Sequence, residues 1–514
     1  MTGPRSPIHL PRWDLNPVVV KELRQAVRNW FVIGVLLLLL LILFVAMVMY
    51  VITESIGASS NPTLGRSVFQ LFFGILSVGS MIFIPGYTGT RFAKEREDAN
   101  VDLMFITTLT PGQIIRGKIL CGVILTGLFF SVFMPFMAFT YLLRGIDLPS
   151  IFIVLVMNFI TVTAMIHLAV LLASLPVSRN FKIGITAGTF FLGISWIGGL
   201  TFGAFEMINR GVGSRLGSWD FWGPALTFLV AAALVMRVLY IAAVALITAP
   251  SANRALPVRV NTTICFLVAA AIPLLWEYFG GVGGGSGITE RISAIFGLPL
   301  LAVCLIVCVS SHDKLSLRIR RTIPRSPLKR ALAFVFYSGA AGGLVWCALL
   351  AGFILGLGML SFTGFAFAPR SIRSITPGGH DWLVFASIIA YFFAYALTGL
   401  YLHRRFWPTR PPKLAGIAAV IVPLLFGVIP TLVLFFLNRF TSTSLEHFMP
   451  GNIFNLFVQS GANAGPHLIT ASVWLIVMAF LNAPWFFRQF AAFTNYLPAG
   501  EKAADGSTLP PILD

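Results

Sequence analysis

Charged side chains are scarce in this chain: they make up 11% of its 514 residues, whereas a typical soluble protein has about 25%. Acidic residues are the rarer part, with 18 Asp and Glu against 36 Lys and Arg. Apolar residues reach 57%. So little charge excludes an ordinary soluble domain and indicates a polytopic membrane protein.

Motifs for chemistry are also missing. The chain has no G-x-x-x-x-G-K-[ST] pattern and no soluble segment long enough for a nucleotide-binding domain, so any ATP hydrolysis would take place on a separate polypeptide. None of the seven His residues is spaced from a carboxylate as in a metal site or a general base. We therefore expect no catalytic residue, no cofactor and no metal, and we do not interpret the chain as an enzyme.

The five cysteines all lie inside apolar runs, which predicts no disulfide framework. Cys304 and Cys308 share a helix face, which leaves metal or redox chemistry open. Because no His or carboxylate lies near them on that face, packing of small residues is the favoured interpretation.

Long apolar runs dominate the rest of the sequence. Since about 20 residues cross the hydrocarbon core as a helix, each of these runs is a candidate span. The chain has twelve of them, at about 31–53, 68–90, 119–143, 151–175, 181–203, 221–249, 261–279, 292–311, 331–358, 383–402, 414–437 and 467–487. An even count places both termini on one side of the membrane.

The basic residues predict which side that is. The termini and the loops on their side hold 27 of the 36 Lys and Arg, and the opposite loops hold 8. This asymmetry is typical of the positive-inside rule, so both termini are expected in the cytoplasm. The net charge of +18 is dispersed over short loops, which argues against a nucleic-acid partner. The basic loop 312–330 is expected to hold anionic lipid headgroups, with a specific partner as the alternative.

An amphipathic helix is expected just before the first span. Asn16 suits a helix cap and Pro17 the first helical position. Apolar residues then recur at helical spacing, at Val19, Val20, Leu23, Val27 and Trp30. The polar residues lie mostly on the other side of the helix, at Lys21, Arg24, Gln25 and Arg28. This pattern favours a helix on the membrane surface over a plain basic flank of the first span.

The segment Arg91–Lys118 is a charged island between two apolar runs. It opens on charges of both signs, at Lys94, Glu95, Arg96, Glu97 and Asp98. An apolar patch follows, formed by Leu103, Met104, Phe105 and Ile106. The segment ends on a helix start, at Thr110, Pro111, Gly112 and Gln113. Thr110 and Gln113 have the spacing of a capping box, with Pro111 at the first helical position. We expect a short helix in water here, whose apolar patch needs a partner or the membrane surface.

This segment resembles the first cytoplasmic loop of the transmembrane subunits of ABC-2 type transporters. The residues that carry the resemblance are Glu95–Arg96–Glu97, Asp102–Leu103–Met104, Thr107–Thr108–Leu109–Thr110–Pro111 and Gly117–Lys118, together with the opening Asn16–Arg24. It covers roughly residues 15–250. Asn100 stands where Thr is common in that family, and the chain is about twice the usual six-helix length. The resemblance implies a separate ABC ATP-binding subunit that binds this loop, and a second permease chain is a further candidate partner.

Polar residues within the apolar runs are few. Arg237 lies near the middle of 221–249, and Asn158 and His167 share the run 151–175. An ionisable residue at such depth tends to face the interior of a bundle. For Arg237 three interpretations stay open: a role in transport, a structural contact between helices, and a shifted helix boundary.

Together these patterns predict an all-α membrane protein with twelve spans, an N-terminal interface helix and a cytoplasmic coupling helix. Its expected organisation is a tail and interface helix (1–30), an ABC-2-like six-helix domain (31–250) and a second six-helix region (251–514). The expected function is that of the transmembrane subunit of an ATP-driven exporter in a bacterial cytoplasmic membrane, in contact with membrane lipids. The alternatives are a secondary transporter, which would need several carboxylates within the membrane, and a scaffold subunit.

Overall fold

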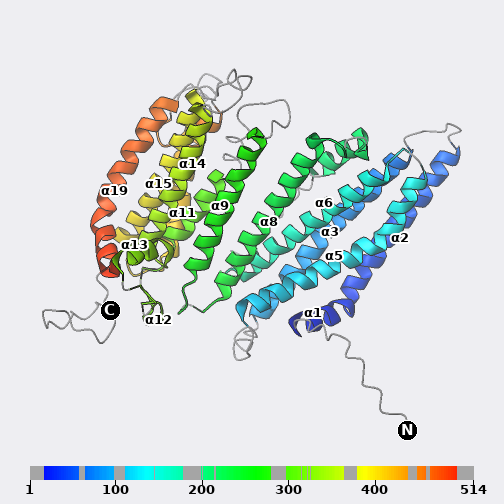
Figure 1. Cartoon of the computed structure of the whole chain (residues 1–514), viewed down its shortest axis with the longest axis horizontal. Coiled ribbons are helices and arrows are strands. Elements are labelled where there is room, and N and C mark those ends of the chain that lie inside the picture. The colour runs from blue at the N-terminus through cyan, green and yellow to red at the C-terminus, as the bar shows by residue number, and fades with distance from the viewer. Residues whose placement is uncertain are drawn as a thin grey trace, which may run out of the picture. The chain divides into compact units, whose positions relative to one another are not determined.

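The computed structural model describes residues 17–56, 64–97, 110–143, 145–176, 198–199, 201–213, 216–249, 251–278, 297–313, 315–320, 322–324, 326–363, 379–437, 449–458 and 464–494. Every regular element in these ranges is a helix (Figure 1). The chain divides into two compact units, Met1–Thr248 and Ala249–Asp514. Each unit has its own apolar core.

Unit 1 consists of long helices packed side by side. They are α1 (Pro17–Val27), α2 (Trp30–Ile56), α3 (Leu64–Glu97), α5 (Pro111–Leu142), α6 (Leu148–Ser174) and α8 (Trp219–Ile247), with further helical residues at 201–210. Small residues allow close approach where α3, α5 and α6 meet. A Cβ on Gly122 of α5 would lie 2.9 Å from the side chain of Ile166 and 3.2 Å from that of Thr88. Such contacts through small residues are how helices pack in lipid, where the hydrophobic effect between helices is absent.

Unit 2 combines long helices with short ones. They are α9 (Ala255–Tyr278), α11 (Leu298–Val309), α12 (Leu317–Arg320), α13 (Pro327–Phe336), α14 (Ala340–Thr363), α15 (Gly379–Phe406), α16 (Lys413–Phe436), α18 (Asn455–Val458) and α19 (Ala464–Thr494). Here too glycine sets a close helix crossing. A Cβ on Gly399 of α15 would lie 2.5 Å from the carbonyl oxygen of Ala415 in α16. The core of this unit is centred on α15, where Tyr391 is fully buried.

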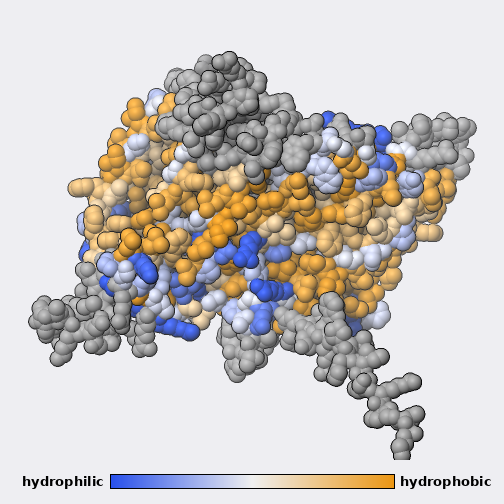
Figure 2. Space-filling model, viewed as in Figure 1, coloured by the Kyte–Doolittle hydropathy of each residue, from blue (hydrophilic) through white to orange (hydrophobic). Residues whose placement is uncertain are grey.

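The helices have the length and composition of membrane spans. Within the described ranges, nine are long and apolar enough to cross a bilayer, and a tenth results if α13 and α14, which meet at 86°, count as one broken span. In Figure 2, orange apolar residues cover much of the described surface of each unit. The chain is therefore an all-helical, multi-span membrane protein.

The count of twelve spans stays a prediction. The run at 181–203 lies largely outside the described residues. The described helix within 292–311 is α11, which has only 12 residues. The run at 331–358 is divided between α13 and α14 by their sharp bend. The other nine predicted runs each contain one long helix.

The N-terminal helix forms where it was predicted, but its faces differ from the expected pattern. Val18, Val19, Glu22 and Ala26 are buried, whereas Val20 and Val27 are exposed. The reason is that α1 packs against α5, so one of its sides belongs to the protein interior. The predicted apolar residues thus divide between the protein interior, with Val19, and the exposed side, with Val20 and Val27. The helix is confirmed, and its place on the membrane surface stays a prediction.

Candidate functional site

The first turn of α5 is built as its local sequence predicts. The Thr110 side chain accepts a hydrogen bond from the backbone N–H of Gln113 at 3.4 Å, and the Gln113 side chain accepts one from the Thr110 N–H at 2.8 Å. Pro111 occupies the first helical position. The capping box is thus confirmed, and it satisfies two N–H groups that a helix start leaves without intrahelical partners.

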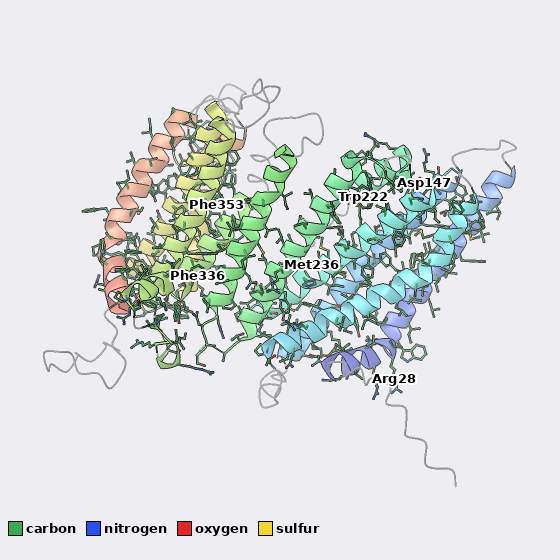
Figure 3. All side chains as sticks on the ribbon, in the orientation of Figure 1. Arg28, Asp147, Trp222, Met236, Phe336 and Phe353 are labelled. Carbon is green, nitrogen blue, oxygen red and sulfur yellow. The ribbon has the colours of Figure 1, made fainter. Side chains whose placement is uncertain are left out.

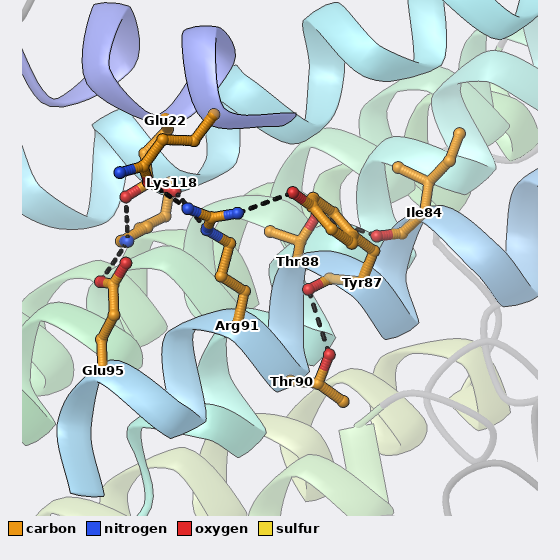
Figure 4. A network of polar contacts seen from close by, with 9 residues as sticks. Glu22, Ile84, Tyr87, Thr88, Thr90, Arg91, Glu95 and Lys118 are labelled. Atoms are coloured by element: carbon orange, nitrogen blue, oxygen red, sulfur yellow. Dashed lines mark hydrogen bonds and ion pairs between the residues drawn. The ribbon is translucent and has the colours of Figure 1, made fainter. Parts of the chain in front are cut away.

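Two turns further along α5, Lys118 is buried between two carboxylates. Only 2% of this residue is exposed. Its Nζ lies 2.5 Å from Oε1 of Glu22 in α1 and 2.5 Å from Oε2 of Glu95 in α3 (Figure 4). Glu22 is itself only 3% exposed. One ammonium group therefore joins three helices that are far apart in sequence.

Arg91 of α3 completes this group. Its Nε lies 3.3 Å from Oε2 of Glu22, and its guanidinium donates to the Tyr87 hydroxyl at 2.9 Å and to the side-chain oxygen of Gln25. We call Glu22, Arg91, Glu95 and Lys118 the α5 ion cluster. With two cations and two carboxylates the cluster carries no net charge, as burial requires.

A second contact fixes the same end of α5 from another side. Arg116 donates through Nε to the hydroxyl of Tyr240 in α8 at 2.9 Å, and its guanidinium lies over the Tyr240 ring, 5.6 Å from the centroid. The Tyr240 hydroxyl also donates to the carbonyl oxygen of Gly112 at 3.4 Å. The first turns of α5 are thus held by α1, α3 and α8 together.

The predicted residues of the Arg91–Lys118 segment divide into two sets. Glu95, Arg96 and Glu97 belong to the last turn of α3, and Pro111 begins α5. The prediction that these charges begin a separate short helix is wrong, because α3 continues through them to Glu97. With 34 residues, α3 is about 51 Å long at ~1.5 Å per residue, more than a hydrocarbon core of about 30 Å requires. Asp98, Leu103, Met104, Phe105 and Ile106 lie outside the described residues.

Sequence reasoning missed the roles of Glu22, Arg91 and Lys118. A signal for Glu22 was present, because the buried residues Val18, Val19 and Ala26 stand four before, three before and four after it. Those spacings place an acid on the buried face of a helix. Such an acid requires a buried cation as its partner.

The role of Arg237 stays a prediction. Its side chain is exposed on α8. Ala243 of the same helix faces the core, and only 1% of this residue is exposed. Because successive residues turn by about 100°, Arg237 lies about 120° around the helix from Ala243. The Nδ1 of His167 lies 2.8 Å from the carbonyl oxygen of Thr163 in its own helix.

Two cysteines of unit 2 pack against each other. The sulfur atoms of Cys308 in α11 and Cys347 in α14 lie 3.8 Å apart, and both residues are buried. Across the described part of the chain, no three His, Cys, Asp or Glu side chains come together as a metal site would require. The cysteines therefore contribute small buried side chains to the contact between α11 and α14.

Comparison with known proteins adds no relative. No family model matches the chain, and no match was found among curated proteins or solved structures. The resemblance to ABC-2 type subunits therefore rests on the residues quoted for it, and the exporter function stays a prediction.

Proposed function

We propose that this chain is the transmembrane subunit of an ABC-2-like exporter in a bacterial cytoplasmic membrane. A separate ATPase binds the segment between α3 and α5, and its movement displaces those helices. The observation that carries the proposal is the α5 ion cluster. It joins the two helices on either side of that segment to each other through Glu95 and Lys118, and to α1 through Glu22.

The cluster supports a mechanical role for the segment. A force applied between Glu97 and Thr110 acts on the end of α3 and the start of α5. Because Lys118 is bound on both sides and Tyr240 holds the start of α5, these ends move as one body with α1 and α8. A rigid connection of this kind is what turns a movement of the partner into tilting of several spans.

The docking element itself is the apolar patch Leu103, Met104, Phe105 and Ile106. Each large side chain buried against a partner contributes about 1.5–3 kcal/mol before the costs of ordering are counted. The charges of Glu95, Arg96, Glu97 and Asp98 orient the partner more than they add affinity. The competing interpretation is that the patch rests on lipid headgroups.

The proposed orientation follows from the distribution of Lys and Arg. With 27 of the 36 on the side of the termini, that side is the cytoplasm. The segment between α3 and α5 is on the same side, where ATP is available. Recovery of an ATPase through this segment would therefore support the orientation as well.

The experiment is a pull-down with the tagged full-length chain from its native membranes. The double substitution Met104→Asp and Phe105→Asp should leave expression and membrane insertion intact but abolish co-purification of an ATPase and the coupled ATP hydrolysis. The matched control replaces Phe406 and Trp407, an exposed apolar pair at the end of α15, with Asp. This control should still recover the ATPase.

Three results would contradict the proposal. One is an undiminished yield of ATPase with the Met104/Phe105 variant. Another is that the unsubstituted protein never recovers an ATPase, which would favour a secondary transporter or a scaffold subunit. A loss of ATPase with both variants would also count against it, because the docking would then not be specific to the apolar patch.

A further inference from the structure

Unit 1 contains a cavity of about 530 Å³ among α3, α6, α8 and the helical residues 201–210. It lies toward the end of the unit where Asp147 and Trp222 are labelled in Figure 3. This volume falls in the range of about 300–1,000 Å³ that is usual for small-molecule sites. Its wall is mostly apolar, with Phe73, Met81, Val154, Met157, Phe221 and Phe228 among the lining residues.

Two polar side chains in this wall lack a partner. Asn158 is only 4% exposed, yet neither its Nδ2 nor its Oδ1 has a hydrogen-bond partner within the described part of the chain. The same holds for the hydroxyl of Ser77, which is 1% exposed. Both residues line the cavity, Asn158 from α6 and Ser77 from α3. A buried amide without hydrogen bonds is costly, and it is costlier where lipid surrounds the protein.

A second buried asparagine, in unit 2, shows the usual arrangement. Asn482 is 2% exposed and fully paired: Nδ2 donates to the carbonyl oxygens of Leu397 at 3.2 Å and Met478 at 2.8 Å, and Oδ1 accepts from Arg404 at 2.9 Å. The difference is that Asn482 packs against protein, whereas Asn158 borders a cavity. A molecule bound in that space could therefore supply the hydrogen bonds that Asn158 does not receive from the protein.

The cavity wall is held in place by hydrogen bonds at its end. Asp147, which caps α6, accepts from the backbone N–H of Gly213 at 2.9 Å, and the hydroxyl of Ser150 accepts from the N–H of Val212 at 2.8 Å. Asp147 also accepts from the hydroxyl of Ser150 at 2.7 Å. These bonds fix the chain after residues 201–210 to the start of α6. They therefore restrict the movement of this end of the cavity wall.

The charges at the cavity indicate what kind of molecule fits. Among the lining residues that the structure describes, the charged ones are Glu206 and Arg210, and they pair with each other at 2.7 Å. We propose that the cavity binds one neutral amphipathic molecule, with a hydrocarbon body against the apolar wall and a hydroxyl or amide group bonded to Asn158 and Ser77. This site requires no ATPase, so the inference goes beyond the proposed function and stands apart from it.

The test uses photoreactive probes on the purified full-length protein in lipid nanodiscs. One probe is a long-chain primary alcohol with a diazirine in its chain, and the matched probe is the diazirine alkane of equal length. Mass spectrometry should locate the alcohol on lining residues such as Met81, Met157 and Phe228, and excess unlabelled alcohol should compete. The alkane should label the cavity less, because it offers Asn158 no hydrogen bond.

Asn158→Leu should reduce labelling by the alcohol about two- to tenfold, the equivalent of one hydrogen bond, and leave the alkane unaffected. The melting temperature of this variant should stay level or rise, because an unpaired polar group is removed. Asn482→Leu should do the opposite: it should lower the melting temperature and preserve labelling of the cavity. Ser77→Ala provides a second, smaller change and should also reduce labelling by the alcohol.

Three results would overturn the inference. The first is equal labelling by alcohol and alkane in the unsubstituted protein. The second is unchanged labelling by the alcohol in both Asn158→Leu and Ser77→Ala. The third is the absence of label on the lining residues, which would mean that the cavity holds water alone.

Discussion

Both units bury a cation, but they compensate its charge in different ways. Lys118 of unit 1 is 2% exposed and lies between the carboxylates of Glu22 and Glu95. Arg259 of unit 2 is 3% exposed and has three backbone carbonyl groups as its partners. Its guanidinium donates to the carbonyl oxygens of Val335 at 2.7 Å, Tyr337 at 2.6 Å and Gly339 at 2.9 Å.

The partners of Arg259 lie at the break between α13 and α14. The last carbonyl groups of a helix have no intrahelical partner and form the negative end of its dipole. Arg259 meets that end of α13, while Asp313 accepts from the Ala340 N–H at the start of α14 at 3.3 Å. Gly339 makes the turn between the two helices with a φ of +139°, a region that other residues rarely adopt. In unit 2 the buried charges therefore face helix ends, whereas in unit 1 they face each other.

The largest effect is expected from Lys118→Met. The substitution leaves Glu95 without its cation and Glu22 with Arg91 alone, and breaking a buried ion pair on one side costs about 3–5 kcal/mol. Thermal unfolding of the purified protein in detergent should show a strongly lowered melting temperature. Lys94→Met, which removes an exposed lysine from the last turn of α3, next to Glu95, is the matched control.

Adding Glu95→Gln to Lys118→Met should recover part of this loss, because one of the two carboxylates is then neutral. This double variant distinguishes a charge effect from a packing effect. If Lys118→Met has the same melting temperature as Lys94→Met, the α5 ion cluster does not stabilise unit 1. If the added Glu95→Gln recovers nothing, the comparison between the units loses its electrostatic basis.

A smaller loss, about 1–3 kcal/mol, is expected from Arg259→Met. The carbonyl groups of Val335, Tyr337 and Gly339 would lose the guanidinium as a donor, although Gly339 keeps the N–H of Gly343. The substitution also relieves the cost of burying a guanidinium. The measurement is again the melting temperature, with Arg318→Met at an exposed site as the control. A loss larger than that of Lys118→Met would show that helix ends compensate a buried cation better than carboxylates do.

Local patterns in the sequence predicted the local structure. The scarcity of charge and the long apolar runs predicted an all-helical membrane protein, because both follow from the hydrocarbon environment. The capping box of Thr110 and Gln113 was predictable because its two residues are three positions apart. Nothing outside that turn is needed to form it.

Contacts between distant residues were not predictable in this way. Glu22 and Lys118 are 96 positions apart, and no pattern in one sequence pairs them. The bend between α13 and α14 lies within one apolar run, 331–358, which a hydropathy pattern represents as a single straight span. The run contains Gly339, but the groups that complete the bend, Arg259 and Asp313, come from other helices and loops. For the same reason Asn158 was recognised as an intramembrane polar residue, but its cavity was not.

The smallest effect concerns Asp313, the acid on the other side of the break. Burial raises the pKa of this carboxyl above its ordinary value of 3.8, and hydrogen bonds from the Ala340 N–H and the Trp485 Nε1, with the charges of Arg404 and His312, offset part of that rise. A carboxyl with a raised native pKa binds its proton more tightly in the folded state. Its contribution to the free energy of unfolding therefore falls as pH rises from about 3.8 through the native pKa, by at most about 1.4 kcal/mol per pH unit.

Asp313→Asn removes this titration but keeps only one of the two acceptors, because the Ala340 N–H donates to Oδ1 at 3.3 Å and the Trp485 Nε1 donates to Oδ2 at 3.1 Å. The variant should melt below the unsubstituted protein at the acidic end, where Asp313 is protonated, because the variant lacks one acceptor. This difference should shrink as pH rises and the buried carboxyl of Asp313 ionises. Melting curves of both proteins across this pH window measure the difference directly. The difference in melting temperature between the two proteins could instead stay constant with pH, or the variant could become relatively less stable as pH rises. Either result would mean that the start of α14 stabilises the carboxylate enough to outweigh the cost of its burial. Asp313 would then be compensated by a helix end as fully as Lys118 is by its two carboxylates.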